Sequence, residues 1–445
     1  MKYHVFSVFV LLATPTMTAM ALMSPRLRGF LLGALVFSTM LGDVANINFM
    51  SMETYRGPDR GYEVSLTDVI AWALVLAMVW QHRRRIQWIP LNTFWMFLFF
   101  VLCCLSTLLS PEPLLGSFTL FKAVRVYLVY WCVTNALRIG TPLASIQHGF
   151  VAIGLLATPL ALQQKYFQGI YRIPLFFDHS NTVPPYLNLM FPMLLLWGLC
   201  DQTQKGFTKG LSITAAMSMV FAVVMTFSRA GTAIAGAVVV GCLCFAVVFR
   251  PSRQVGIASA LVAAGMLVGA VKVYDSVAER IKRAPKESGD ARDEFNYAAE
   301  LMAADRFLGV GLNNFSHVLT STPRYRDHFD VMASEEQAGV AHHIYWLTAA
   351  ELGYPGLYLF LMVLLRFFWT AFRFSIGHLS RERLALVGAT VGFLTLHVSG
   401  FLEWALRISP VTFQCAIIAG ITTACAESLR RAPRLAASSL DGGLS

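Results

Sequence analysis

The amino-acid sequence predicts an all-α protein that crosses a membrane about twelve or thirteen times. The chain of 445 residues is 56% apolar and only 13% charged, whereas soluble domains carry about 25% charged residues. Its apolar residues form many runs of roughly 20, the length that crosses a bilayer as a helix. A soluble core cannot cover so many helices that are apolar on every side.

Thirteen apolar runs are candidate spans, or twelve if one of the first two does not cross. The first 23 residues are similar in outline to a signal peptide, but their basic start is thin, so we expect an uncleaved first span. We expect spans near residues 5–23, 29–47, 66–82, 91–109, 115–136, 147–165, 183–200, 210–227, 231–249, 255–274, 343–368, 384–403 and 410–427.

The connections between these runs alternate in character. Clusters of Lys and Arg occur in every second connection, for example at 81–85, 250–253 and 373–383, and the positive-inside rule places them in the cytoplasm. This distribution accounts for the net charge of +10 and argues against nucleic-acid binding. The remaining connections are expected on the extracytoplasmic face.

One bundle with one long loop is the predicted organisation. Residues 1–274 would form ten helices with short loops, 275–342 a long periplasmic loop, 343–430 the C-terminal helices, and 431–445 a disordered cytoplasmic tail. All eight cysteines fall within apolar runs. They have no metal-ligand spacing and no evident disulfide pairing, so we interpret them as packing residues.

An arginine and a histidine pair at the outer face could take part in chemistry. Arg229 lies at a turn before Gly231, and its planar fork suits phosphate oxygens; a snorkelling interfacial arginine is the plainer alternative. His342, followed by His343, stands where the long loop re-enters the membrane. A histidine there can serve as general base or simply mark a helix start.

The long loop also carries Arg292, a stretch at 297–306 that could lie along the membrane surface, and a glycine-containing turn at 307–315 expected to dock the loop on the bundle. Before the seventh run, Arg172, Asp178, His179 and Asn181 could bind sugar hydroxyls or be solvated loop residues.

Charged residues inside the apolar runs need partners or a function. Lys122 and Arg125 stand inside an apparent span, where they could be paired, functional or snorkelling. Glu403 and Arg407 are four residues apart, a spacing that predicts an ion pair within one helix.

Several of these stretches together resemble the superfamily of O-antigen ligases and O-antigen polymerases, bacterial envelope glycosyltransferases. Residues 177–182 are similar to the family's aromatic–His–x–Asn segment, and 226–231 to its Ser–Arg–x–Gly turn. The turn in the long loop and the residues that follow it are also similar, and 53–62 resembles a subgroup of the family. The stretches are 53–62, 177–182, 226–231, 307–315, 341–345 and 350–356.

The resemblance implies a GT-C-like helical bundle in the bacterial inner membrane, with a periplasmic active site and no metal or other cofactor. The donor would be a glycan on undecaprenyl pyrophosphate. The acceptor would be lipid A–core for a ligase, or another lipid-linked glycan for a polymerase of O-antigen or exopolysaccharide. Membrane lipid would be a further partner.

The resemblance also implies roles for individual residues. Arg229 and Arg292 would hold the pyrophosphate, and His342 would activate the acceptor hydroxyl, although His343 replaces a residue that is commonly small and polar, so either histidine could be the base. A base on the opposite face of the anomeric carbon gives inversion. The expected substrate-binding residues are Arg172, His179, Asn181, His343 and Tyr345.

Two other functions remain open from the sequence. A transporter of a lipid-linked substrate would place charges near mid-membrane in symmetric, broken helices, whereas the charges here gather at one face. If the protein is instead a scaffold in an envelope assembly, replacing Arg229 or His342 with alanine should leave glycan assembly intact. We therefore expect Arg229, Arg292 and His342 to converge on one outward-facing cavity.

Overall fold

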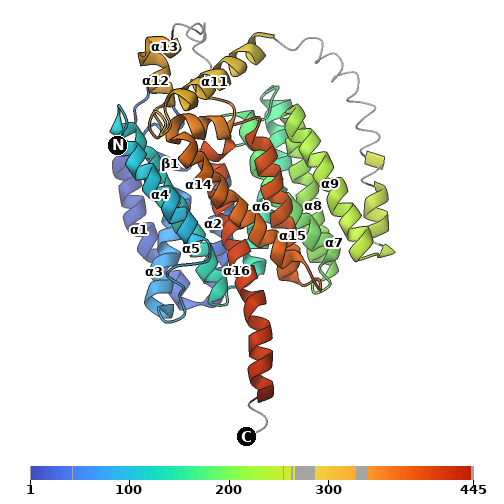
Figure 1. Cartoon of the computed structure of the whole chain (residues 1–445). Helices are drawn as coiled ribbons and strands as arrows, with labels where there is room; N and C mark the ends of the chain where they lie inside the picture. Colours follow the sequence, from blue (N-terminus) through green and yellow to red (C-terminus); the bar gives the residue numbers. More distant parts are fainter. Residues whose placement is uncertain are drawn as a thin grey trace.

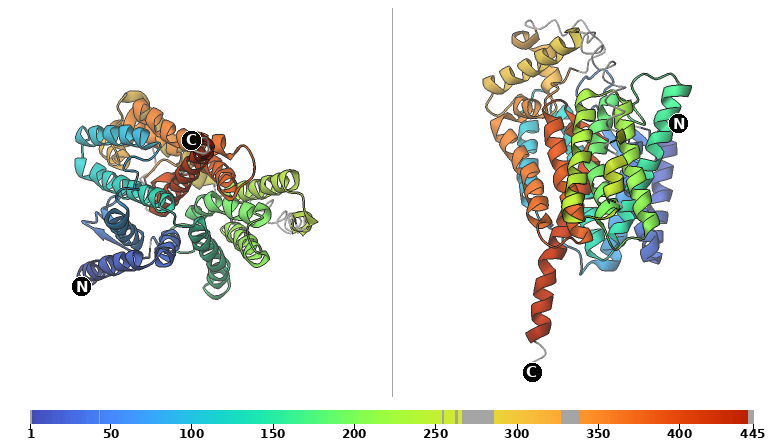
Figure 2. Two further views of the ribbon diagram at one scale, coloured as in Figure 1. Left: turned by 90° about the horizontal axis from the view of Figure 1, so that it is seen from below. Right: turned by 90° about the vertical axis from the view of Figure 1, so that its right-hand side faces the viewer.

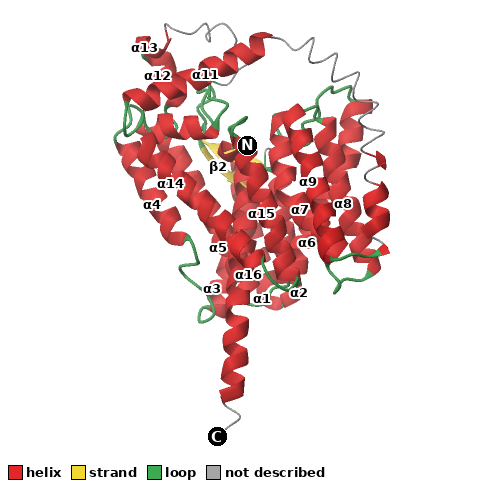
Figure 3. Ribbon diagram, turned by 45° about the vertical axis from the view of Figure 1, so that its right-hand side comes forward, coloured by secondary structure: helices red, strands yellow, loops and turns green. Residues whose placement is uncertain are grey.

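The computed structural model describes residues 2–42, 44–253, 255–261, 264–265, 286–326 and 339–441. Long helices run side by side through most of the molecule (Figure 1). A short antiparallel hairpin, β1 (Asn46–Phe49) and β2 (Tyr62–Ser65), lies at one end of the bundle (Figure 3). The all-α polytopic prediction is confirmed.

Eight helices of the described part are long and apolar enough to cross a membrane, and α3 and α4 are shorter apolar helices. The bundle helices are α1 (Lys2–Met23), α2 (Pro25–Ser38), α3 (Leu66–His82), α4 (Thr93–Leu108), α5 (Pro113–Arg138), α6 (Leu143–Leu162), α7 (Val183–Cys200), α8 (Gly206–Met225), α9 (Arg229–Phe249), α14 (Ile344–Ser375), α15 (Arg381–Gly400) and α16 (Ser409–Asp441).

Most expected spans coincide with these helices, but two spans and the C-terminal tail differ. The second span was expected to reach residue 47, but α2 ends at Ser38 and the chain then forms a 3-10 turn and β1. The span expected at 255–274 lies largely outside the described residues, although 255–261 and 264–265 are helical. The tail expected to be disordered from 431 is helical to Asp441, in a segment of α16 that extends beyond the bundle (Figure 1).

Helix α7 forms the centre of the bundle, and all of its residues are buried. Two glycines of α15 allow the two helices to approach closely. A Cβ atom at Gly388 would lie 2.4 Å from the Met193 backbone, and one at Gly392 would lie 2.4 Å from the Leu189 carbonyl. The position of α7 fixes the segment that precedes it, which carries three predicted substrate-binding residues.

The described part of the long loop covers one end of the bundle, which we call the capped end (Figure 2). It forms α11 (Lys286–Asp305), α12 (Phe315–Ser321) and α13 (Pro323–Arg326). The apolar side of α11, including Phe295, Ala299 and Met302, joins a core cluster with the start of α14. The expectation that residues 297–306 lie along the membrane is therefore wrong for this apolar side, because protein covers it.

The turn at residues 307–315 docks the long loop on α14, as predicted. The Val310 amide donates to the Ala350 carbonyl at 2.8 Å, and the Gly311 amide to the Glu351 carbonyl at 3.0 Å. Gly353 interrupts α14 with a φ of 70°, and a Cβ atom there would lie 1.9 Å from the Phe307 carbonyl oxygen. Close backbone contact therefore requires glycine at this position.

Ion pairs hold the hairpin region to the bundle at the capped end. Asp59 pairs with Lys122, and Arg125 pairs with Glu63 of β2 at 3.5 Å and with Asp68 of α3 at 2.6 Å. The predicted pair between Glu403 and Arg407 is absent. Helix α15 ends before Glu403, and Arg407 instead pairs with Glu351 at 2.8 Å. Lys122 and Arg125 are therefore buried ion-pair partners.

The opposite end of the bundle, which we call the basic end, gathers the Lys- and Arg-rich connections. Contacts there join the ends of helices distant in sequence: Arg28 with Gln81 at 3.4 Å, Arg138 with Glu427 at 2.6 Å, Arg250 with the Leu379 carbonyl at 3.0 Å, and Arg381 with Asp201 at 3.5 Å. The alternation read from the sequence thus corresponds to two ends of one bundle.

Candidate functional site

The carboxylate of Glu403 is the meeting point of three distant segments at the capped end. It accepts from the Asn181 side-chain amide at 2.9 Å and pairs with the Arg292 guanidinium at 3.1 Å. The Nδ1 atom of His342 lies 3.2 Å from its second oxygen. The Glu403 amide donates to the Ser399 carbonyl at 2.9 Å, which ties this residue to the end of α15.

His342 is oriented by this carboxylate. Its Nδ1 atom faces Glu403, and Nε2 has no hydrogen-bond partner among the described residues. The side chain is 18% exposed. A carboxylate at one ring nitrogen fixes the tautomer and orients the ring, which leaves the other nitrogen available to take a proton.

Arg292 belongs to the same cluster. Helix α11 places it above Glu403, and its side chain remains 40% exposed. A guanidinium carries five N–H donors, and one contact with Glu403 leaves others available. The Glu403 carboxylate therefore holds a base, His342, and a cation, Arg292, which come from opposite ends of the described loop.

Arg172 and Asn181 extend the cluster toward α9. Arg172 donates to the Asn181 side-chain oxygen, and its Nε donates to the Thr226 carbonyl at 3.3 Å. The side-chain amide of Asn188 donates to the Gly231 carbonyl at 3.2 Å. These bonds connect the polar segment before α7 to the turn that contains Arg229.

Arg229 itself does not touch the cluster. It is the first residue of α9, its side chain is exposed, and within the described ranges it has no ion pair or side-chain hydrogen bond. Ser228 caps the helix by accepting from the Gly231 amide at 3.3 Å. Of the three residues expected to converge, the structure joins Arg292 and His342, and leaves Arg229 on a neighbouring turn.

His343 and Tyr345 make contacts within the protein. The Nδ1 atom of His343 accepts from the Trp346 amide at 3.2 Å and caps α14. Burial lowers the pKa of His343, which favours the neutral ring that this cap requires. The Tyr345 hydroxyl lies 2.8 Å from Nδ1 of His397. Neither residue contacts Glu403.

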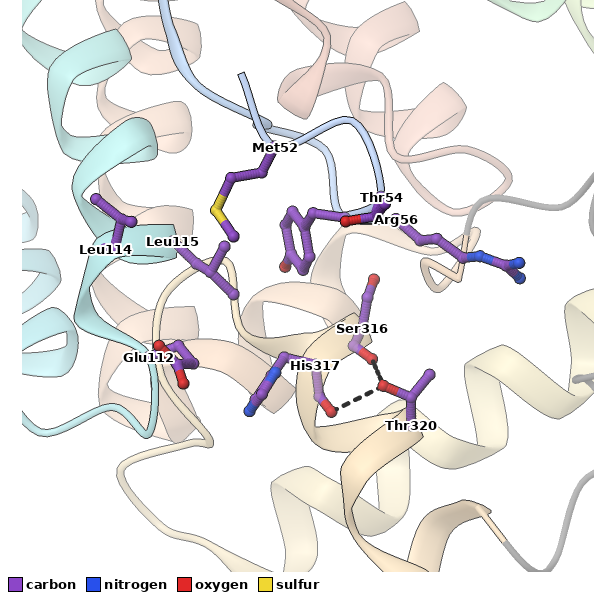
Figure 4. A pocket seen from close by; sticks show the side chains of 10 residues that line it. Met52, Thr54, Arg56, Glu112, Leu114, Leu115, Ser316, His317 and Thr320 are labelled. Atoms are coloured by element: carbon purple, nitrogen blue, oxygen red, sulfur yellow. Dashed lines mark hydrogen bonds between the residues drawn. The ribbon is translucent and has the colours of Figure 1, made fainter. Parts of the chain in front are cut away.

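His179 lines a cavity of about 800 Å³ beside the Glu403 cluster. Its walls are formed by residues 53–61, by Asp178, His179 and Thr182 before α7, and by residues that follow Glu403. A smaller pocket of about 400 Å³ adjoins it, with Met52, Leu115 and Ser316 on its walls, and the Arg56 side chain extends away from them (Figure 4).

The described residues contain no group of three His, Cys, Asp or Glu side chains that could hold a metal ion. At the Glu403 carboxylate, Arg292 lies at 3.1 Å and His342 at 3.2 Å. The chemistry that the described side chains offer is proton transfer and anion binding.

Glu403 is the site residue that sequence reasoning missed. Its spacing to Arg407 favoured an intrahelical pair, which would have removed it from consideration. The local signal that α15 ends before Glu403 was Gly400, because glycine is common where a helix ends.

A comparison with known proteins relates one part of the chain to a known family. Residues 214–361 match the family model described as O-antigen ligase. The matched region contains Arg229, Arg292 and His342, whereas Arg172, Asn181 and Glu403 lie outside it. A search of curated proteins found no match. The matched stretch is therefore similar to the O-antigen ligase family, and the helices that are long and apolar enough to cross a membrane agree with a multi-pass membrane protein.

Proposed function

We propose that this protein is an O-antigen ligase that moves a glycan from undecaprenyl pyrophosphate to a hydroxyl of lipid A–core. The reaction takes place at the periplasmic face of the bacterial inner membrane. The match of residues 214–361 supports a membrane glycosyltransferase of the ligase and polymerase type. Polymerisation of lipid-linked repeats is the alternative within the same superfamily, and the product analysis below separates the two.

The pairing of His342 and Arg292 on Glu403 is the observation that carries this proposal. Nε2 of His342 takes the proton of the acceptor hydroxyl while the hydroxyl oxygen bonds to the anomeric carbon. The bond from that carbon to the pyrophosphate oxygen breaks, and its electron pair leaves with the pyrophosphate. Glu403 stabilises the imidazolium, and attack opposite the leaving group inverts the configuration.

Arginine side chains stabilise the leaving pyrophosphate in this proposal. Negative charge develops on the pyrophosphate as the glycosidic bond breaks, and preorganised cations lower the barrier at that point. Arg292 reaches the site from α11 with its side chain 40% exposed. Arg229 is exposed at the start of α9 and has no ion-pair partner among the described residues, so it is free to bind a phosphate.

The test replaces Arg229, Arg292 and His342 one at a time with alanine in a strain that lacks the chromosomal gene. We expect each variant to lose about 10²–10³-fold in transfer, the typical effect of removing a charge-stabilising group or a base. Envelope glycan is analysed on gels, and protein amounts in the membrane are matched by immunoblotting. Arg306→Ala, an exposed arginine in the turn after α11, is the control.

The accumulated intermediate identifies the activity. Long lipid-linked chains that never reach core lipid indicate a missing ligase, whereas single repeats indicate a missing polymerase. Normal glycan from all three variants at normal protein amounts would contradict a glycosyltransferase role and favour a scaffold.

A further inference from the structure

A polar cavity at the capped end lies next to Glu403, although Glu403 itself is not part of its wall. Its volume of about 800 Å³ lies within the range of ligand sites in proteins. The geometry points to this cavity, hereafter the acceptor cavity, as the site that binds the saccharide of the acceptor. This inference rests on the proposed glycosyl transfer. Its walls include Glu53, Tyr55, Arg56, Arg60, His179 and Trp404.

The lining suits a hydroxyl-rich ligand. Carboxylate, guanidinium and imidazole groups supply both donors and acceptors, as alternating sugar hydroxyls require. Trp404, half-buried at the cavity wall, adds aromatic surface that suits the apolar face of a sugar ring. The polar side chains Glu53, Arg56 and Arg60 are exposed, so they can exchange water for ligand without breaking a buried ion pair.

Residues on the wall of the acceptor cavity are neighbours in sequence of the residues in the Glu403 cluster. Trp404 follows Glu403 directly, and His179 and Thr182 flank Asn181, whose amide donates to Glu403 at 2.9 Å. A saccharide in this cavity therefore lies beside the carboxylate that orients His342. The acceptor is the substrate whose hydroxyl must reach that histidine, so the position fits the acceptor.

Arg407 supplies an independent observation at the same cavity. Its Nη1 pairs with Glu351 at 2.8 Å, but its Nε and Nη2 atoms are buried without a hydrogen-bond partner among the described residues. Arg407 is also one of the residues that line the cavity. Nε–H and Nη2–H lie on one edge of the guanidinium plane, a geometry that binds two oxygens of one ligand. Oxygen atoms of a saccharide, or of water that it displaces, would satisfy them.

The test measures transfer by purified full-length protein, with undecaprenyl-pyrophosphate glycan as donor and lipid A–core as acceptor. We expect Arg56→Gln and Arg60→Gln to raise the acceptor KM about tenfold each, the effect of losing one hydrogen bond to a charged group, with the donor KM unchanged. Arg306→Ala is the matched control for a lost exposed arginine. Thermal unfolding in detergent confirms that all variants are folded.

A second experiment tests occupancy of the acceptor cavity by cysteine labelling, without removing a side chain that is expected to bind the acceptor. Thr54 is exposed at the cavity wall, so Thr54→Cys should react with a bulky hydrophilic maleimide and thereby block transfer. Saturating lipid A–core should protect this cysteine, and donor alone should not. Ser321→Cys, exposed on α12 outside the cavity, should react equally with or without acceptor and should retain transfer.

The outcomes separate this inference from the proposed function. If the unaltered protein does not transfer glycan to lipid A–core, the proposed ligase activity is wrong, and the inference is rejected with it. If it transfers, but the arginine variants keep the acceptor KM and lipid A–core fails to protect Thr54→Cys, only the acceptor cavity is wrong. A raised donor KM, or protection by donor, would assign the cavity to the donor glycan instead.

Discussion

At the scale of single residues, one carboxylate organises the candidate site. Glu403 contacts Asn181, Arg292 and His342, which are 222, 111 and 61 residues away in sequence. Sequence reasoning selected all three of these residues from their types and positions. It did not select Glu403, because the spacing of four residues to Arg407 suggested an ion pair within one helix. Only the fold shows that α15 ends before Glu403.

Glu403→Gln tests the role of this carboxylate as a positioning residue. Glutamine keeps a hydrogen-bonding oxygen near Nδ1 of His342 but loses the charge that stabilises the imidazolium. We expect transfer to fall about 10–100-fold, the typical effect of removing a partner that orients a functional histidine, as in metal sites. The fall should lie in kcat, with both KM values changing little. Initial rates at varied donor and acceptor concentrations measure this split.

Two variants sharpen this experiment. Glu300→Gln changes an exposed carboxylate on the same helix as Arg292 and should keep full activity. Glu403→Asp keeps the charge on a shorter side chain and should recover part of the lost rate. A Glu403→Gln protein with normal kcat would mean that Glu403 only supports the fold.

Asp59 shows a second residue-scale effect, on stability. Burial alone would raise the pKa of Asp59, but the charges of Lys122 and Arg407 outweigh burial and lower it. A lowered carboxyl pKa stabilises the folded state at pH above the ordinary value of about 3.9, and this contribution is lost as the pH falls further. We therefore expect part of the acid sensitivity of the protein to come from Asp59.

Asp59→Asn should reduce stability by about 3–5 kcal/mol, the usual cost of removing one partner of a buried ion pair. Lys122 is then left buried, with side-chain exposure of 7%, and without its carboxylate. Thermal unfolding in detergent at neutral pH measures the loss. The double variant Asp59→Asn, Lys122→Met should be more stable than Asp59→Asn, since it leaves no unpaired charge. A single variant as stable as the unaltered protein would contradict this account.

At the scale of elements, helix bounds followed from the sequence where apolar runs ended at polar residues. The spans expected at 66–82 and 183–200 coincide with α3 and α7. The apolar run that begins α2 continues past Ser38 into the hairpin region, and its periodicity gave no sign of the change. Likewise, the amphipathic pattern of α11 indicated a covered face, but whether lipid or α14 covers it depends on tertiary packing.

Gly353 allows the long loop to dock, and Gly353→Ala tests this. A Cβ atom would lie 1.9 Å from the Phe307 carbonyl oxygen, and the φ of 70° is strained for alanine. We expect the turn at 307–315 to shift, with Arg292 displaced from Glu403 and transfer reduced at least about tenfold. Limited proteolysis should cut the loop faster. Gly236→Ala in α9, where no atom lies within 4 Å of the added Cβ, should change neither.

At the scale of the whole molecule, the two ends of the bundle differ in charge and in cover. The basic end collects the Arg-rich connections and the C-terminal part of α16, whereas α11 to α13 cover the other end (Figure 1). The alternating pattern of basic connections predicted this division, because topology depends on charge counts and not on tertiary contacts. The pairing of the capped-end residues could not be predicted in this way, since it requires the packing of α7, α14 and α15.

The orientation of the bundle is the last prediction. If the basic end faces the cytoplasm, Ser321→Cys on α12 should react with a membrane-impermeant maleimide after the outer membrane alone is permeabilised. Gln202→Cys, exposed in the connection between α7 and α8 at the basic end, should react only once the inner membrane is also opened. The unaltered protein sets the background. Its eight cysteines lie in membrane helices, so this background should be low. The reverse labelling pattern would place the Glu403 cluster in the cytoplasm, away from a periplasmic glycan donor.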